Sequence, residues 1–111
     1  MYEVLYYVSP SNEDFVDEFI SSLKNKVVDG RLLARLDYLE MHGPQAKPPA
    51  FEYLGDKIYY IRLSCGKLEV RIFYFFDGKK IILTHGFFKK TPKAPPSEIA
   101  RAKAIYTEYF R

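Results

Sequence analysis

The chain has 111 residues, a formal net charge of +3 and a single cysteine, Cys65. This length fits one compact domain over residues 1–111. One sulfur excludes a disulfide framework and a cysteine-based zinc finger. No apolar run approaches the ~20 residues that cross a bilayer, and the first residues lack the basic start of a secretion signal. We therefore expect a cytoplasmic protein with no membrane partner.

The two halves of the chain differ in charge. Residues 1–56 carry ten acidic and five basic side chains, a net charge of −5, whereas residues 57–111 carry four acidic and twelve basic side chains, a net charge of +8. Such an asymmetry is typical of proteins with an anionic partner, for example nucleic acid. The alternative is that folding interleaves both halves into one mixed surface.

The first half predicts a strand and two helices. Residues 2–8 are rich in aromatic and β-branched side chains, which favours a strand. Residues 11–27 predict a helix whose N-cap is the hydroxyl of its first residue. A break at residues 29–30 separates it from a second helix over residues 32–42, and Gly43 is placed to end that helix in a left-handed conformation.

The second half predicts an antiparallel meander and a last helix. Residues 44–50 contain three prolines and form an extended connection. Three apolar, aromatic-rich runs, at 57–64, 68–76 and 80–88, are separated by turn residues and predict consecutive strands. Pro95 and Pro96 then start a helix with one apolar stripe.

The predicted order is therefore β-α-α-β-β-β-α, an α+β domain with an antiparallel sheet and its helices packed mainly on one face. In the middle strand of the meander, Arg71 alternates with apolar side chains and marks the opposite, functional face, which we expect to stay open. Tyr60 and Arg62 share one side of the preceding strand. The two arginines then project toward one groove if the strands pair in the required register.

The sequence contains no recognisable metal, cofactor or hydrolase motif. His42 and His85 lie in different elements without cysteine or carboxylate at ligand spacing. Basic residues beside aromatic residues are the remaining signal, and this combination suits RNA because cations hold phosphates while rings stack on unpaired bases. Ordinary strand composition is the alternative explanation.

Four segments of the second half resemble a known toxin family. They are IYYIRL at 58–63, VRIFYFF at 70–76, HGFFKKTP at 85–92 and SEIARA at 97–102. Together they are similar to the phage-derived, HigB-like branch of the RelE toxin superfamily. The first 50 residues of the chain match this family by the order of their predicted elements only.

This resemblance implies a RelE-like domain that acts as the toxin of a type II toxin–antitoxin system. Such a toxin is a metal-independent endoribonuclease, an mRNA interferase that cuts messenger RNA on the ribosome and needs no cofactor. The 2′-hydroxyl attacks the adjacent phosphate while basic side chains stabilise the developing charge. The implied partners are messenger RNA on the ribosome and a HigA-like helix-turn-helix antitoxin.

Site residues follow from the resemblance by position. The catalytic phosphate clamps are the two strand arginines and the two strand-end lysines, Arg62, Arg71, Lys89 and Lys90. Further RNA contacts are assigned to Tyr60, Phe88 and Lys93.

The chain departs from the family at two positions. Tyr60 stands where relatives often carry a glutamate, and Ala94 stands where the last helix expects a capping side chain. The proton acceptor is therefore unassigned, with His85, Tyr106 and Tyr109 as candidates.

Two other functions fit the same residues. One is a non-catalytic RNA- or ribosome-binding module, such as a decayed toxin, which binds RNA in a salt-dependent way without cutting it. The other is an interaction protein whose basic groove holds only an acidic partner segment. Cleavage of RNA distinguishes the toxin from both alternatives, and affinity for RNA distinguishes the RNA-binding module from the interaction protein.

Overall fold

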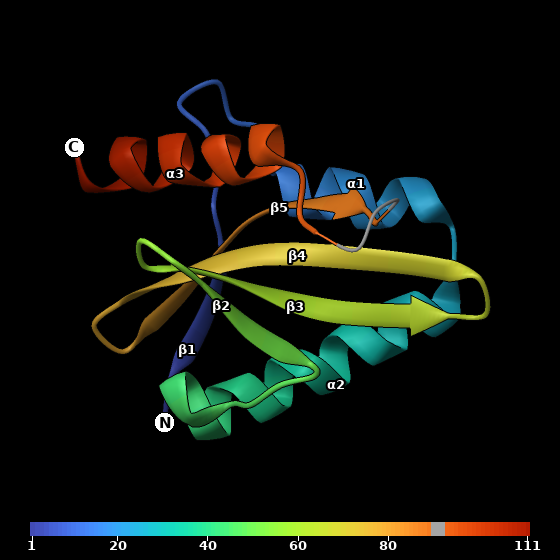
Figure 1. The fold of residues 1–111 in the computed structure, drawn as a ribbon. Helices are drawn as coiled ribbons and strands as arrows, with labels where there is room; N and C mark the ends of the chain where they lie inside the picture. Colours follow the sequence, from blue (N-terminus) through green and yellow to red (C-terminus); the bar gives the residue numbers. More distant parts are fainter. Residues whose placement is uncertain (90–92) are drawn as a thin grey trace.

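The computed structural model describes residues 1–89 and 93–111 and has an α+β fold (Figure 1). Its elements are β1 (Glu3–Tyr6), α1 (Phe15–Leu23), α2 (Lys26–His42), a single 3-10 turn (Gly43–Gln45), β2 (Phe51–Gly55), β3 (Ile58–Cys65), β4 (Leu68–Asp77), β5 (Lys80–Phe88) and α3 (Pro96–Phe110). The five strands form one sheet in the order β1-β5-β4-β3-β2. The predicted fold class and the predicted meander are confirmed.

The sheet differs from the prediction in two ways. It has an additional strand, β2, which pairs antiparallel to β3. It is also mixed rather than antiparallel, because β1 pairs parallel to β5, with Glu3 opposite Lys80 and Tyr6 opposite Leu83. The composition of residues 2–8 predicts a strand, but it carries no information about which distant strand becomes the partner.

The break between the first two helices lies earlier than predicted. Lys24 adopts a left-handed conformation with φ of 49°, and the side chain of Asn25 then accepts hydrogen bonds from two backbone N–H groups in the first turn of α2. Gly30 lies inside α2, so the break predicted at residues 29–30 is wrong. An asparagine N-cap satisfies two orphan donors, which outweighs the modest cost of a helical glycine.

The outer ends of these helices are also capped. The carboxylate of Asp14, rather than the predicted hydroxyl of Ser11, accepts a 2.9 Å hydrogen bond from the backbone N–H of Asp17 at the start of α1. Gly43 ends α2 with the predicted positive φ, 53°, although its ψ of −129° lies outside the left-handed helical region. The predicted start of α3 at the two prolines is confirmed, because Pro95 is its N-cap residue.

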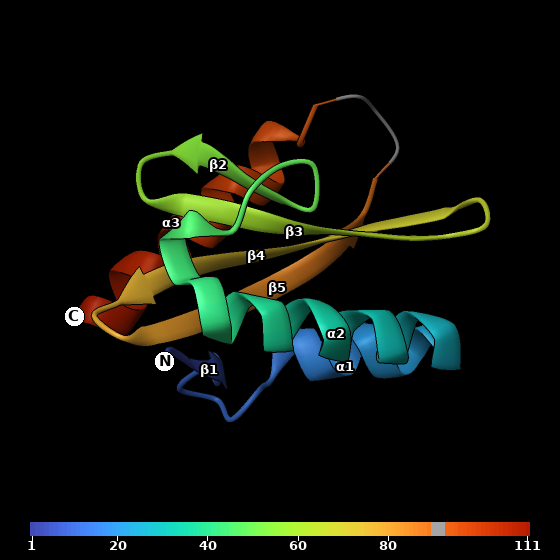
Figure 2. The same ribbon diagram turned by 90° about the horizontal axis from the view of Figure 1, so that it is seen from below.

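Helices cover both faces of the sheet. Figure 2 shows α2 in front of the strands and α3 behind them. Phe73 and Phe75 of β4 point to the side of α3, where they are completely buried with Ile105 of that helix. The expectation of an open sheet face is therefore wrong for the part that α3 covers. We call the two faces the α2 side and the α3 side.

None of the helices in the described ranges combines the length and apolar character needed to cross a bilayer.

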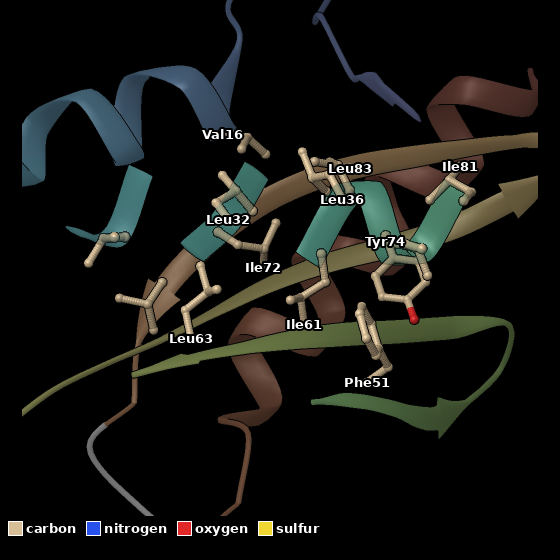
Figure 3. Packing of buried hydrophobic residues seen from close by; sticks show 13 residues of the cluster. Val16, Leu32, Leu36, Phe51, Ile61, Leu63, Ile72, Tyr74, Ile81 and Leu83 are labelled. Atoms are coloured by element: carbon tan, nitrogen blue, oxygen red, sulfur yellow. The ribbon is translucent and has the colours of Figure 1, made fainter. Parts of the chain in front are cut away.

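The larger core lies on the α2 side. Figure 3 shows side chains of α1 and α2 meeting those of the strands, among them Val16, Leu36, Ile61, Ile72 and Leu83. The alternation along β4 that was predicted from the sequence is confirmed, because alternate residues enter the two separate cores. The sheet is therefore packed on both of its faces.

Gly86 allows α1 to approach β5 closely. A Cβ atom at this position would lie 2.6 Å from a ring carbon of Phe19 and 2.7 Å from the end of Ile72. We therefore expect Gly86→Ala to lower the free energy of unfolding by about 1 to 3 kcal/mol, the usual cost of overpacking a core. Chemical denaturation measures this change. Gly30→Ala is the matched control, because a Cβ there meets nothing within 4 Å, and it should stabilise the protein slightly. Equal effects of the two substitutions would contradict the packing argument.

Candidate functional site

Two arginines face each other across neighbouring strands. Arg62 of β3 lies directly opposite Arg71 of β4, and strand alternation places both on the α3 side, with Phe73 and Tyr60. The register that the sequence left open therefore brings the two side chains together. Like charges directly opposite each other destabilise a sheet. The pair is therefore a candidate site for an anion, which would offset the repulsion.

Arg71 is the largest of the fully buried side chains, with 1% of its surface exposed. Its Nη1 donates a 3.2 Å hydrogen bond to the carbonyl of Val70, and its guanidinium lies 5.4 Å from the ring centre of Tyr60. Its Nη2 is 3.9 Å from a carboxylate oxygen of Glu69, too far for a hydrogen bond. Among the described residues this buried nitrogen has no hydrogen-bond partner. An unsatisfied buried donor is unusual in a folded protein and often marks a functional group.

Tyr60 lies between Arg71 and a carboxylate that the sequence analysis missed. Glu52 of β2 pairs directly with Tyr60 of β3. Burial raises the pKa of the Tyr60 hydroxyl, the adjacent Glu52 carboxylate raises it further, and Arg71 lowers it. The tyrosine is buried in the α3-side core. Its ring therefore packs beneath the arginine rather than standing free to stack on a base.

The predicted lysines lie after the end of β5. The backbone N–H of Lys89 donates a 3.0 Å hydrogen bond to the carbonyl of Glu69, so this half-buried lysine lies beside the segment of β4 that leads to Arg71. Lys93 is exposed before the start of α3. Lys90 lies outside the described residues.

The two phenylalanines at the end of β5 point to opposite faces. Phe87 lies opposite Arg71 and stacks on Phe73 with ring centres 5.2 Å apart, on the α3 side. Phe88 is 42% exposed and contacts the ring of Phe19 in α1, which places it on the α2 side. The sheet therefore separates Phe88, the predicted stacking residue, from the arginine pair.

His85 connects the sheet to α3. Its Nε2 lies 3.2 Å from a carboxylate oxygen of Glu98, and its Nδ1 lies 3.1 Å from the hydroxyl of Thr84. A carboxylate only accepts hydrogen bonds, so Nε2 carries the proton and Nδ1 accepts from the hydroxyl. Burial, together with the positive charge of Arg101, lowers the pKa of His85 to about 3. The histidine is therefore neutral, and its Nε2 links β5 to α3 through Glu98 while its Nδ1 is occupied by Thr84 of β5 itself.

The two tyrosine candidates for proton acceptor lie at the other end of β4. The Tyr109 hydroxyl donates a 2.7 Å hydrogen bond to Asp77, and burial together with that carboxylate raises the pKa of Tyr109 to about 12. Tyr106 packs edge-on against Phe75. Asp77 lies six positions along the strand from Arg71, a distance of about 20 Å. Neither tyrosine belongs to the arginine site.

Comparison with known proteins gives one finding about the family. The model of a family described as phage-derived protein Gp49-like (DUF891) matches residues 18–107. No match is found among curated proteins. The matched segment begins within α1 and ends within α3, so it contains the arginine pair, both neighbouring carboxylates and the lysines after β5.

Proposed function

Because the chain belongs to the phage-derived Gp49-like family, a RelE-like and toxin-like family, we propose that it is the toxin of a type II toxin–antitoxin system and cleaves messenger RNA on the ribosome. The observation that supports this function best is the cross-strand pair of Arg62 and Arg71, with a buried guanidinium nitrogen that lacks a hydrogen-bond partner among the described residues. Phosphate is the ligand that a guanidinium fork matches in geometry and charge.

In the proposed reaction the ribose 2′-oxygen forms a bond to the adjacent phosphorus. The bond from phosphorus to the 5′-oxygen of the next nucleotide breaks, leaving a 2′,3′-cyclic phosphate and a 5′-hydroxyl end. The 2′-hydroxyl proton passes to a base, and the departing 5′-oxygen gains a proton. Negative charge builds up on the phosphate oxygens, so fixed positive charges lower the barrier.

Arg62 and Lys89 are half-buried and hold the phosphate directly in this proposal. Arg71 acts from beneath them. Its charge is almost fully shielded from water, so its electrostatic effect on a phosphate above it is screened less than that of a surface arginine. Lys90 is expected to add a further contact.

The proton acceptor is one of two carboxylates that lie near the arginines. Glu69 approaches Arg71 directly, and Glu52 adjoins Tyr60. Each of them lies at a different position from the glutamate that relatives often carry, where this chain has Tyr60. We favour them over His85, because both of its ring nitrogens are already occupied.

The proposed partner is a HigA-like helix-turn-helix antitoxin that keeps the enzyme inactive. A neighbouring reading frame that encodes such a protein is expected. Co-expression of the two proteins should restore the growth that the toxin alone arrests.

The test combines purified ribosomes, a translated message and the protein, with primer extension to map new 5′ ends. The wild type should cut the message only when it is being translated. Arg62→Gln should slow cleavage by about 100-fold or more, the usual effect of removing one group that stabilises transition-state charge.

Lys103→Gln is the matched control for loss of one positive charge. Lys103 is an exposed residue of α3 that pairs with Asp56 at 2.7 Å, away from the arginine pair, and its variant should cut like the wild type. RNA binding without any cut would instead identify a non-catalytic RNA-binding module. Absence of both would leave the interaction-protein alternative.

A further inference from the structure

Two arginines of α2 close the free edge of β3. The backbone N–H of Arg62 still bonds to the segment that leads into β2, but β2 does not extend further along β3. Beyond this point, Nε of Arg35 donates to the Arg62 carbonyl at 3.2 Å, and Nη1 of Arg31 donates to the Ser64 carbonyl. Figure 1 shows α2 beside this half of β3. Both arginines protect a strand edge that would otherwise be unpaired.

The two edge arginines differ in their surroundings. Arg35 lines a pocket of about 340 Å³, whereas Arg31, one turn earlier in the same helix, does not. The pocket is also lined by Arg62, Ser64 and Glu69. Because Glu69 approaches Arg71 as well, the pocket adjoins the arginine pair on the α3 side.

The pocket has an excess of positive charge and of unused donors. Arg35 and Arg62 line it, with Glu69 as the one carboxylate among the residues that do so. A guanidinium has five N–H donors. Within residues 1–89 and 93–111, Arg35 uses only its Nε, and the side chain of Arg62 has no hydrogen bond or ion pair. The bond to the strand edge accounts for one of the five donors of Arg35 and leaves the other four without a partner among the described residues.

We propose that this pocket binds a phosphate of the RNA backbone next to the phosphate that is cleaved, with Arg35 as its ligand and Arg62 shared between the two phosphates. The proposal rests on the proposed function and extends it by a second contact along the same strand. Planar guanidinium forks suit a tetrahedral phosphate in this arrangement, and the Ser64 hydroxyl is a further donor. Continuity with the Arg71 site favours RNA over an acidic segment of a protein partner.

The experiment measures binding of a short, fluorescent, single-stranded RNA with 2′-O-methyl groups, which removes the attacking hydroxyl. Dissociation constants are determined over a range of salt concentrations. For Arg35→Gln we expect about a tenfold loss of affinity at low salt, and a salt dependence whose slope is smaller by about 0.7, the value for one phosphate contact on a single strand. Arg35→Lys keeps the charge but not the fork, so it should keep the slope and lose part of the affinity.

Arg31→Gln is the matched control, since it removes the same charge and the same kind of edge hydrogen bond outside the pocket. It should bind RNA like the wild type, and thermal unfolding verifies that both variants are folded. Equal slopes for the wild type and Arg35→Gln, or equal losses in both glutamine variants, would overturn the phosphate site while leaving the proposed function intact. Normal RNA binding by the wild type without cleavage of translated message would overturn the proposed function instead. If Arg35→Gln weakens binding of the antitoxin but not of RNA, the pocket belongs to the protein partner and the proposal is wrong.

Discussion

Replacing Arg71 with methionine should strongly slow cleavage of translated message and yet leave the protein at least as stable as the wild type. A buried charge without full hydrogen bonding costs stability, and apolar residues of similar volume are often neutral or stabilising by about 1 to 4 kcal/mol. The same change removes the buried positive charge beneath the phosphate, which should lower the cleavage rate by about 100-fold or more. Chemical denaturation and primer extension measure the two effects separately.

Arg71→Lys completes the comparison. The smaller ammonium keeps the charge but cannot reproduce the contacts over the ring of Tyr60, so this variant should be less stable than Arg71→Met and also impaired in cleavage. If Arg71→Met instead unfolds the protein, the arginine has a structural role. Wild-type cleavage by a folded Arg71→Met would remove it from the site. Arg71→Ala is a poorer test, because truncating a fully buried side chain leaves a cavity.

Acidification should destabilise the protein before most carboxylates titrate, because of His85. The folded protein holds this histidine neutral with a pKa of about 3, whereas in the unfolded chain it binds a proton near pH ~6.5. The unfolded state therefore binds more protons between these values, and stability falls as the pH falls. From pH 7 to pH 5 we expect a loss of about 2 kcal/mol in the free energy of unfolding, measured by denaturant titration at each pH.

His85→Gln should flatten this dependence, because an amide does not titrate and its N–H can still donate to Glu98. His42→Gln is the control. His42 is exposed at the end of α2, against Tyr38, and takes no part in the buried contact between His85 and Glu98. A wild type whose stability does not change over this range would mean that the Glu98 carboxylate keeps the buried histidine charged.

Local patterns account for most of the fold. The alternation along β4 and the helical stripe after Pro96 predicted both strand faces and the last helix, because each depends on nearby residues only. β2 was missed since Phe51–Gly55 is short and follows three prolines. The aromatic residues of this segment, ended by a glycine, were the available signal. The parallel pairing of β1 depends on a partner almost eighty residues away, which periodicity does not reveal.

The site was only partly predictable for a similar reason. Arg62 and Arg71 followed from strand alternation and resemblance, and the observed register brings them together. The sequence did not show that Arg71 is buried, because burial depends on how α3 and the neighbouring strands cover it. Glu52 could not be placed without β2. Arg35 lies in the acidic half of the chain, so the excess of basic residues in the second half gave no indication of it. Only the spacing of Glu69 and Arg71, two residues apart on one strand, offered a direct signal.

The pairing of the first strand with the last has a consequence for how the protein is made. During synthesis, α1 and α2 emerge before the strands that they cover, and β1 has no partner until residues 80–83 follow. Unfinished chains therefore expose apolar helix faces, which is the condition that favours chaperone binding or aggregation. The surface that we propose to bind RNA includes Lys89, which follows β5, and is therefore complete only after that strand has emerged.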